Sequence, residues 1–456
     1  MRLHAHEGLA PATRSRETTM FDHFWTKAAA GCLVAVSLLL TGCGAGSRTA
    51  ANTATEVACD FANPPEPVTV NVLAYNSSAV DPFTNTMVAS CSHDNVTLEH
   101  DPIDFAGQVQ KTTATLSGES GTYDIIESYS FVIPQYGSEG KLEPLDPYLE
   151  EFGDKYGLDA INQEMLDSLS YEGTVYGLPM QAQMLVLAYR KDVFDELGLQ
   201  PPTTFAELRE VSQAIQDAGE IRYPLALPWL SSSDIGTAYK AALGSQGVDY
   251  VDPDTREPLF TSEESRTALE EMKSLVPYMD PQVTTFDQPK VQQQLFNGDA
   301  AMGIMFSGRM VDLTKETNTE HAGDFAFAAP PAVLEGGRQY GALSVDGWSI
   351  PVNTDVDKRL LFELIAASVS EDASRASIPA AYPAREGLVT EENSPYAAAA
   401  NEAIQNVPEP APFPWVAKMS SGTSEVVAQV VTGAISVEEG QRQMQEIGEQ
   451  VMAEQG

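Results

Sequence analysis

Cys43 is a nucleophilic side chain that directly follows an apolar run. Residues 40–43 read LTGC and follow the apolar run Ala28–Leu40, which contains 13 residues. A membrane-spanning helix needs about 17–25 residues, so this run is too short for a span and has the length of a signal-peptide core.

The LTGC segment resembles the bacterial lipobox, and a chance cysteine after an apolar run is the alternative interpretation. The lipobox interpretation predicts that residues 1–42 are a signal peptide, with Met20 as the true start. It also predicts an exported protein that is held at the outer face of the cell membrane only by the lipid on Cys43. The next residues, GAGSRTAANTATE, contain too little apolar surface to pack, so residues 43–63 are expected to form a flexible tether.

The charge of the chain is strongly acidic. It has 65 acidic and 26 basic residues, and 62 and 22 of these remain once residues 1–42 are removed. Nucleic-acid binding is excluded because neutralising phosphates requires clustered Lys and Arg side chains. A solvated acidic surface that keeps a secreted protein soluble is the simple explanation, and cation binding is the alternative. The length of 456 residues allows two or three compact lobes.

Two cysteines remain after Cys32, which leaves with the signal peptide, and Cys43, which carries lipid. Cys59 and Cys91 form an even pair in an oxidising compartment and have no CxxC or His-rich context. This pattern favours a structural disulfide over a metal site or a nucleophile.

Sequence motifs of catalysis and metal binding are missing from the chain. HExxH, GxSxG, P-loop and GxGxxG patterns do not occur, and the histidines after residue 42 are scattered: His93, His100 and His321. Asp252, Asp254 and Glu263 have a faint calcium-loop spacing. Arg256 would occupy a ligand position there and Glu257 the position that needs glycine, so the stretch is expected to be a turn. We therefore expect no metal, no cofactor and no enzymatic activity.

Short apolar runs alternate with helical patterns along the chain, which indicates an α/β fold. Strands are expected at residues 68–75, 96–103, 123–129, 224–227, 300–306 and 325–329. Helices are expected at residues 81–90, 105–116, 194–197, 234–243, 262–276 and 288–296. A further helix should begin after Thr204, because Glu207 follows at the spacing of a capping box.

Four segments together resemble the extracellular solute-binding proteins of carbohydrate ABC importers, the group that includes maltose-binding protein. They are LPMQAQMLVLAYRKDVFDELGL at residues 178–199, PPTTFAELREV at 201–211, FNGDAAMGIMFSGRM at 296–310 and GWSIPVNTDVDKRLLFELIA at 347–366. The first resembles a crossover between two lobes, and the last resembles the return crossover and its helix. Their order behind a lipobox makes the resemblance specific, and it covers essentially the whole chain after the tether.

The resemblance implies a two-lobed periplasmic-binding-protein fold of type II, in which each lobe is a mostly parallel sheet flanked by helices. The first lobe would contain residues 64–184 and about 350–390, and the second residues 185–349 and about 391–456. The helices after Pro414 would pack on the second lobe. The lobes would close around a ligand in the cleft between them.

The function that the resemblance implies is capture of a carbohydrate and its delivery to an importer in the membrane. The partners would be permease subunits with a separate ATPase, and the protein would be a monomer. Two alternatives stay open. The same fold could bind a glycerophosphodiester or a peptide, or the chain could be a secreted glycoside hydrolase with paired carboxylates.

Sugars present hydroxyl edges and apolar C–H faces, so a sugar site needs aromatic faces together with amide, carboxylate or guanidinium groups. The expected ligand-binding residues lie at strand ends, at the crossovers and in aromatic-bearing loops: Tyr75, Asn76, Ser128, Tyr129, Gln183, Trp229, Ser307, Gly308, Arg309, Asp346, Gly347, Trp348, Arg385 and Trp415. For Trp229 the alternative is a packing role, and for Trp415 a surface corner. Gln183 replaces an acid of the maltose-binding relatives, which argues against maltodextrin as the ligand.

Overall fold

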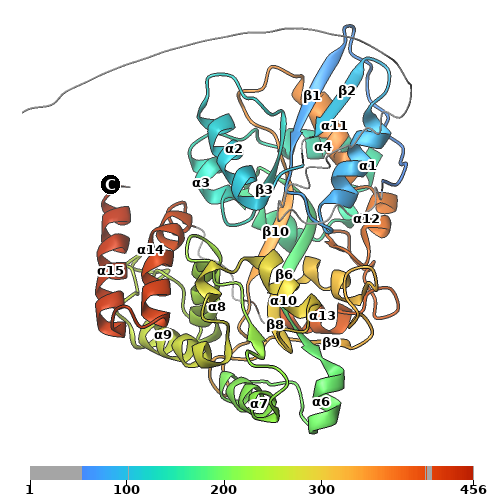
Figure 1. The fold of residues 1–456 in the computed structure, drawn as a ribbon. Helices are drawn as coiled ribbons and strands as arrows, with labels where there is room; N and C mark the ends of the chain where they lie inside the picture. Colours follow the sequence, from blue (N-terminus) through green and yellow to red (C-terminus); the bar gives the residue numbers. More distant parts are fainter. Residues whose placement is uncertain (1–53, 101, 406, 408–412, 455–456) are drawn as a thin grey trace, which may run out of the picture. The chain divides into compact units, whose positions relative to one another are not determined.

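The computed structural model of the protein describes residues 54–100, 102–405, 407 and 413–454. The expected signal peptide, Met20 and the lipidation site Cys43 lie outside the described residues. Within the described part of the chain, no helix is both long and apolar enough to cross a membrane. Nine strands share one sheet, and two more form a separate pair (Figure 1).

Strands and helices alternate along the chain. The strands are β1 (Val68–Leu73), β2 (Val96–His100), β3 (Ile125–Tyr129), β4 (Ser170–Tyr171), β5 (Thr174–Val175), β6 (Leu178–Arg190), β7 (Leu225–Ala226), β8 (Met302–Phe306), β9 (Phe325–Ala328), β10 (Leu343–Ser349) and β11 (Tyr382–Pro383). The helices of the first half are α1 (Asp81–Cys91), α2 (Phe105–Ser117), α3 (Ile133–Ser138), α4 (Asp146–Tyr156), α5 (Gln163–Ser168), α6 (Lys191–Leu197) and α7 (Phe205–Ala218). Those of the second half are α8 (Asp234–Ser245), α9 (Glu263–Leu275), α10 (Gln288–Phe296), α11 (Lys358–Ser368), α12 (Glu371–Ser377), α13 (Ala397–Ile404), α14 (Val416–Val431) and α15 (Val437–Ala453). Short 3-10 turns include η4 (Ser307–Arg309) and η5 (Val311–Thr314).

The long strand β6 connects two groups of strands. Its first part, up to Met184, pairs with β10, and its second part, from Leu185, pairs with β8 and β9. Figure 1 shows β6 passing from the region of β1, β2 and β3 toward β8 and β9. We call the group of β1, β2, β3, β10 and β11 the first lobe, and the group of β7, β8 and β9 the second lobe. The change of partner falls between Met184 and Leu185.

Two details of the expected architecture are wrong. The lobes are not mostly parallel, because β1–β2, β1–β3 and β7–β8 are parallel while β6 and β10 are antiparallel to all their partners. The return crossover also comes earlier than residue 349, since β10 already lies between β3 and β6 in the first lobe. A strand that returns from the other lobe runs against the outgoing strand, which explains why β10 is antiparallel to β6.

Buried apolar side chains form two clusters. One fills the first lobe and continues along β6 and β8 to α10, and α13 belongs to it. Helix α13, which was expected in the second lobe, packs its small alanine face on both β6 and β9. The other cluster fills the second lobe, where α14 and α15 pack against α8 and α9 as expected.

Helix α7 illustrates how local sequence sets the element boundaries. The Thr204 side chain accepts a hydrogen bond from the Glu207 backbone N–H at 3.2 Å, which satisfies one free donor of the first turn. The Glu207 carboxylate accepts from Thr203 N–H at 2.7 Å, one residue before the position of an ideal capping box. Gly219 ends the helix with φ 87°, a conformation that favours glycine.

The last residues of the expected tether pack on the first lobe. Cys59 and Cys91 are joined by a disulfide with 5.4 Å between their Cα atoms, as expected from the sequence. The disulfide holds the segment before β1 against α1, and Val57 N–H donates to the Ser90 hydroxyl at 3.0 Å. Residues 54–63 are therefore fastened along the first lobe, and the rest of the expected tether lies outside the described residues.

Candidate functional site

A cluster of polar side chains lies where β3, β6 and β10 run side by side at the crossovers. Asp346 of β10 pairs with Tyr129 of β3 on one side and with Gln181 of β6 on the other. Its Oδ2 atom accepts from Gln183 Nε2 at 2.7 Å and from Gln181 Nε2 at 3.3 Å, while its Oδ1 atom accepts from the Ser344 hydroxyl at 2.7 Å. We call Glu127, Gln181, Gln183, Ser344 and Asp346 the hinge cluster.

Several polar atoms of this region are buried without a hydrogen-bond partner. Among the described residues, Glu127 Oε1, Gln181 Oε1 and the Ser307 hydroxyl have none, although each is shielded from solvent. The other oxygen of Glu127 accepts from the Tyr75 backbone N–H at 2.6 Å. An unpartnered buried acceptor costs about 1–3 kcal/mol, so such a group calls for a partner, which can be an ordered water, an ion or a ligand.

Both buried acids of the hinge cluster hold their protons more tightly than free carboxylic acids do. Burial raises the pKa of Asp346 to about 6. Burial, together with the nearby charge of Asp346, raises the pKa of Glu127 well above its ordinary value. The hinge cluster therefore carries less negative charge than its composition suggests, and it can donate as well as accept hydrogen bonds.

The second lobe reaches the first through the turn η4 and the turn η5. The Arg309 guanidinium donates to the Tyr75 hydroxyl, and the Ser78 hydroxyl donates to Asp312 Oδ2 at 2.8 Å. Gly308 lies tightly against the first lobe, because a Cβ atom there would come within 2.8 Å of both Ala79 Cβ and Gln183 Oε1. A side chain at this position would push the two lobes apart, so only glycine fits here.

Asn76 supports the loop that follows β1. Its amide donates to both oxygens of Asp81 at 3.0 Å, and Ser77 N–H donates to Asp81 Oδ1 at 3.2 Å. Burial raises the pKa of Asp81 to about 6. The loop before α1 is thus held in one shape beside Tyr75.

The structure brings together eight of the expected site residues: Tyr75, Asn76, Tyr129, Gln183, Ser307, Gly308, Arg309 and Asp346. Sequence reasoning missed Glu127, Gln181 and Ser344. A signal for two of them is visible in the sequence, since amides at 181 and 183 interrupt an otherwise apolar strand at a spacing that places both on one face. Ser128 was expected in place of Glu127, but successive strand residues point to opposite faces, so Ser128 faces away from Glu127 and Tyr129.

The expected tryptophan platforms do not form. Trp229 and Trp348 have no exposed surface and belong to the second and the first apolar cluster respectively. A stacking platform needs one accessible ring face, so both are corrected to core residues. Trp415 is half-buried at the start of α14 and stacks on Phe413 with ring centroids 5.0 Å apart, which occupies one of its faces.

Gly347 and Arg385 also serve the fold rather than the site. A Cβ atom on Gly347 would lie 2.6 Å from the backbone oxygen of Leu178, so glycine allows β10 and β6 to approach at their register shift. Arg385 is buried, and its guanidinium donates to three carbonyl oxygens within the first lobe, those of Val369 at 2.6 Å, Gly157 at 2.7 Å and Tyr156 at 2.8 Å. With its donors occupied in this way, Arg385 is corrected to a structural residue.

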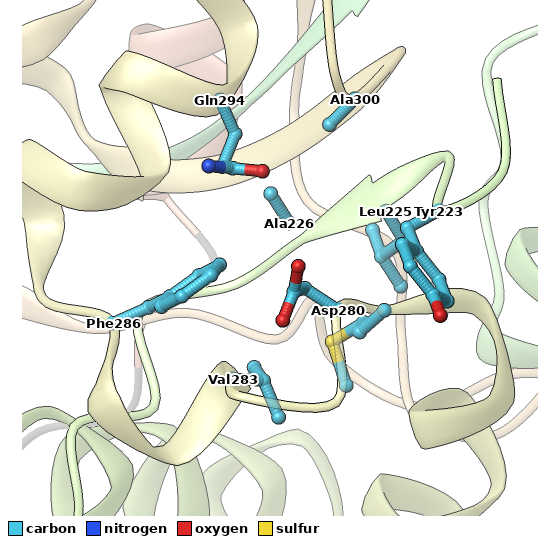
Figure 2. A pocket seen from close by; sticks show the side chains of 9 residues that line it. Tyr223, Leu225, Ala226, Asp280, Val283, Phe286, Gln294 and Ala300 are labelled. Atoms are coloured by element: carbon cyan, nitrogen blue, oxygen red, sulfur yellow. The ribbon is translucent and has the colours of Figure 1, made fainter.

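A small pocket in the second lobe is separate from the hinge cluster. Figure 2 shows Asp280 and Gln294 reaching into it among apolar side chains such as Phe286 and Val283. It has no room for a water molecule, so it cannot hold a sugar. The described residues also contain no group of three or more His, Cys, Asp or Glu side chains that could hold a metal ion.

Comparisons with known proteins agree with the two-lobed architecture. The model of the family described as bacterial extracellular solute-binding protein matches residues 92–372. The structure is similar to that of an ABC transporter solute-binding protein from Agrobacterium radiobacter in complex with ribitol, with a TM-score of 0.76, 20% identity and coverage of 85% of this chain and 100% of that one. This likeness confirms the two-lobed periplasmic-binding-protein fold.

Curated relatives are more distant in sequence. A mannitol-binding protein of Pseudomonas aeruginosa is 25% identical over 258 residues, which cover 55% of this chain and 57% of that protein. A maltotriose-binding protein of Pyrococcus abyssi is 27% identical over 211 residues, which cover 46% of this chain and 42% of that protein. The chain thus spans about half the length of the curated relatives it matches.

Proposed function

The chain belongs to the bacterial extracellular solute-binding proteins, and from this premise we propose that it captures a sugar or a polyol at the hinge cluster and delivers it to an ABC importer. Relatives named for mannitol, maltotriose and ribitol binding support a polyhydroxyl ligand. The observation that carries the proposal is the set of buried, unpartnered oxygens on Glu127, Gln181 and Ser307. Hydroxyl groups of a ligand would pair with these oxygens.

The charge around the hinge cluster favours an uncharged ligand. Glu127, Asp346 and Asp81 are all buried there, and Asp312 lies beside them on η5. Arg309 could attract an anion, but its guanidinium already bonds the Tyr75 hydroxyl. Asp81 and Asp346 have pKa values of about 6, so at neutral pH both are mostly ionised and would repel a phosphate or a carboxylate; a glycerophosphodiester or an acidic peptide therefore fits the site less well than a sugar.

The role of the two lobes is to trap the ligand by closing. Binding between the lobes would favour the arrangement in which Arg309 meets Tyr75 and Asp312 meets Ser78. A permease that recognises this closed arrangement would accept only loaded protein. A lipid on Cys43 would keep the binding protein beside the importer through the tether, and a membrane-bound pool would raise its local concentration.

A thermal-shift screen tests the proposal. The mature chain is heated with sugars, alditols, a glycerophosphodiester and peptides, because a ligand of the folded state raises the melting temperature by mass action. We expect a rise with at least one sugar or alditol, confirmed by calorimetry as saturable binding. A rise with peptide alone, or release of shorter products from an oligosaccharide, would replace the proposal by peptide binding or by glycoside hydrolysis.

Mass spectrometry of the native membrane fraction tests the anchor. We expect the N-terminal peptide to begin at Cys43 and to carry the mass of a diacylglycerol modification. An N-terminal peptide that extends upstream of Cys43, or an unmodified Cys43, contradicts lipid anchoring and leaves ligand capture unaffected.

A further inference from the structure

The loop between β1 and α1 meets the turn η5 of the second lobe, and an acidic side chain lies on each side of this boundary. The Ser78 hydroxyl of the loop donates to Asp312 Oδ2 of η5 at 2.8 Å. Three residues further along the chain, Asp81 begins α1 and keeps only 6% of its surface exposed. We call Ser78, Asp81 and Asp312 the lobe latch.

Asp312 is held in position by its own lobe. Lys315 Nζ donates to Asp312 Oδ1 at 2.7 Å, and Gln292 Nε2 of α10 donates to Asp312 Oδ2 at 3.4 Å. Only 13% of the Asp312 side-chain surface is exposed. The second lobe therefore carries a fixed carboxylate to the boundary, and the bond from Ser78 depends on how close the first lobe comes.

Asp81 is enclosed by both lobes. Within the first lobe its carboxylate accepts from the Asn76 amide at 3.0 Å and from Ser77 N–H at 3.2 Å. Gly308 of η4 covers the same loop from the second lobe, since a Cβ atom on it would come within 2.8 Å of Ala79 Cβ. If the lobes separated, the loop would be uncovered and water would gain access to the Asp81 carboxylate.

The charge of Asp312 acts on Asp81 across the boundary. Burial raises the pKa of Asp81 to about 6, and the negative charge of Asp312 acts in the same direction. On the first-lobe side, the charge of Asp81 helps to raise the pKa of Glu127 on β3. Within the described part of the chain, no charged side chain of β2, α11 or α12, which also pack on α1, shifts the pKa of Asp81. Both causes weaken when the lobes separate, because water enters and the two carboxylates move apart.

We propose that the lobe latch couples closing of the lobes to uptake of a proton by Asp81, so that the protein binds its ligand more tightly as the pH falls. Closing removes water from Asp81 and brings a carboxylate of the other lobe toward it. A proton taken from the buffer removes the resulting repulsion. The closed form then binds more protons than the open form, so a lower pH favours the closed form. The inference rests on the proposed function, because it needs lobes that close around a ligand.

A single amide substitution tests the coupling. Asp81→Asn imitates the protonated acid and keeps an oxygen that can accept from Ser77 N–H. Its affinity is measured by calorimetry between pH 5.0 and pH 7.5 with mannitol, or with the sugar that gives the largest thermal shift where mannitol does not bind. We expect the variant to bind about fivefold more tightly than the wild type at pH 7.5 and equally tightly at pH 5.0.

Proton uptake is a second readout of the same experiment. The heat of binding is measured at pH 6 in buffers that have different ionisation enthalpies, which gives the number of protons taken up with the ligand. We expect the wild type to take up about 0.4 proton more than Asp81→Asn, because Asp81 is half protonated in the closed form and mostly ionised in the open form at this pH.

Two control variants separate the lobe latch from a general effect of substitution. Asp124→Asn changes another buried aspartate of the first lobe, which accepts from Asn71 N–H at 2.8 Å and from the Thr354 hydroxyl at 2.6 Å. It should keep the pH profile of the wild type. Ser78→Ala removes the bond to Asp312 and no titrating group, so it should weaken binding about threefold at every pH.

The results that would overturn the inference differ from those that would overturn the proposed function. Proton coupling is wrong if Asp81→Asn follows the pH profile of the wild type or binds more weakly than the wild type at every pH. Unchanged affinity of Ser78→Ala would show that the bond between the lobes has no part in closing. A wild-type protein that binds no sugar or alditol contradicts the proposed function, and the lobe latch with it.

Discussion

Gln183 and Asp346 of the hinge cluster and the tryptophans Trp229 and Trp348 were all expected to contact a ligand, and the structure places them in different surroundings. Glu127, Gln181 and Ser307 near Asp346 keep buried oxygens without partners, whereas the rings of Trp229 and Trp348 pack in the two apolar clusters, where their Nε1 atoms also lack partners. The apolar surface of a buried indole ring gains free energy from leaving water, which offsets the cost of its N–H group. A buried carboxylate or amide oxygen has no comparable apolar surface, so its burial calls for an explanation.

The difference teaches which kind of residue identifies a site in this fold. Aromatic residues are suited both to a core and to a sugar, and only their exposure separates the two roles. Polar residues inside a sheet have few structural reasons to be there when they lack partners. In this protein the exposed aromatic residues are Phe105 and Phe131 rather than any of the three tryptophans after residue 42 that were expected to bind.

The largest expected effect comes from removing one of the two buried tryptophan rings. Trp229→Ala should lower the free energy of unfolding by about 3–5 kcal/mol, the cost of removing a fully buried large side chain. Ligand affinity, measured at a temperature where the variant is folded, should stay within about threefold of the wild type. Chemical denaturation and calorimetry measure the two quantities. A loss of ligand affinity without a loss of stability would contradict the core role and show that Trp229 contacts the ligand.

Arg385→Met should also act on stability alone. The substitution leaves the carbonyls of Val369, Gly157 and Tyr156 without their donor inside the first lobe, at a cost of at least about 2 kcal/mol. Arg442→Met is the control, because the exposed Arg442 contacts only Glu439 and Glu446 on its own helix and should cost less than about 1 kcal/mol. A stable Arg385→Met protein with weakened binding would show that Arg385 contacts ligand.

Glu127→Gln should weaken binding and leave the folded state at least as stable as before. The amide keeps the size of the side chain but removes a buried acid and one acceptor, so affinity should fall about tenfold or more. Glu363→Gln is the matched control, since the buried Glu363 pairs with Lys155 on α4. This variant should lower the free energy of unfolding of the protein and leave its affinity for the ligand unchanged. The hinge cluster would lose its assigned role if the two variants behaved alike in both measurements.

The smallest effect is a pH dependence of stability. The pKa of Asp346 is raised by burial to about 6 in the folded state from about 3.8 in the unfolded state, so the folded chain binds more protons between these values. The protonated Asp346 side chain stabilises the folded state at low pH, and this stabilisation is lost as the pH rises through about 6. Asp346→Asn should therefore gain melting temperature relative to the wild type, by a few degrees, between pH 5 and pH 7.5. A constant difference across this range would contradict the raised pKa.

Much of the fold was predictable from local patterns. The expected strands and helices match β1 to β3, α1, α2 and α8 to α10 within a few residues, because apolar periodicity and capping residues act over short distances. The apolar run between Pro179 and Arg190 was visible in the sequence, whereas its passage between two lobes was implied only by the resemblance to solute-binding proteins. Strand direction was not predictable, because an apolar run looks the same in parallel and antiparallel pairs.

The sequence predicted the region of the candidate site better than it predicted the individual residues. Strand ends and crossovers pointed to Tyr75, Gln183, Arg309 and Asp346, which the structure brings together. The prediction included Ser128 with Tyr129 and left out Glu127, because neighbouring strand residues point to opposite faces and the sequence does not show which face meets the site. Arg385 looked like a cation for a ligand because its three carbonyl partners come from segments far away in the chain.

The amino-acid sequence by itself determined the α/β class, the disulfide partners and the acidic character of this protein. These follow from periodicity, composition and a count of cysteines, which do not depend on long-range contacts. Only the tertiary structure decided which aromatic residues are core and which are exposed, and which buried oxygens lack partners. The reason is physical: burial and hydrogen-bond satisfaction depend on every segment that packs around a group, and distant segments meet only in the folded chain.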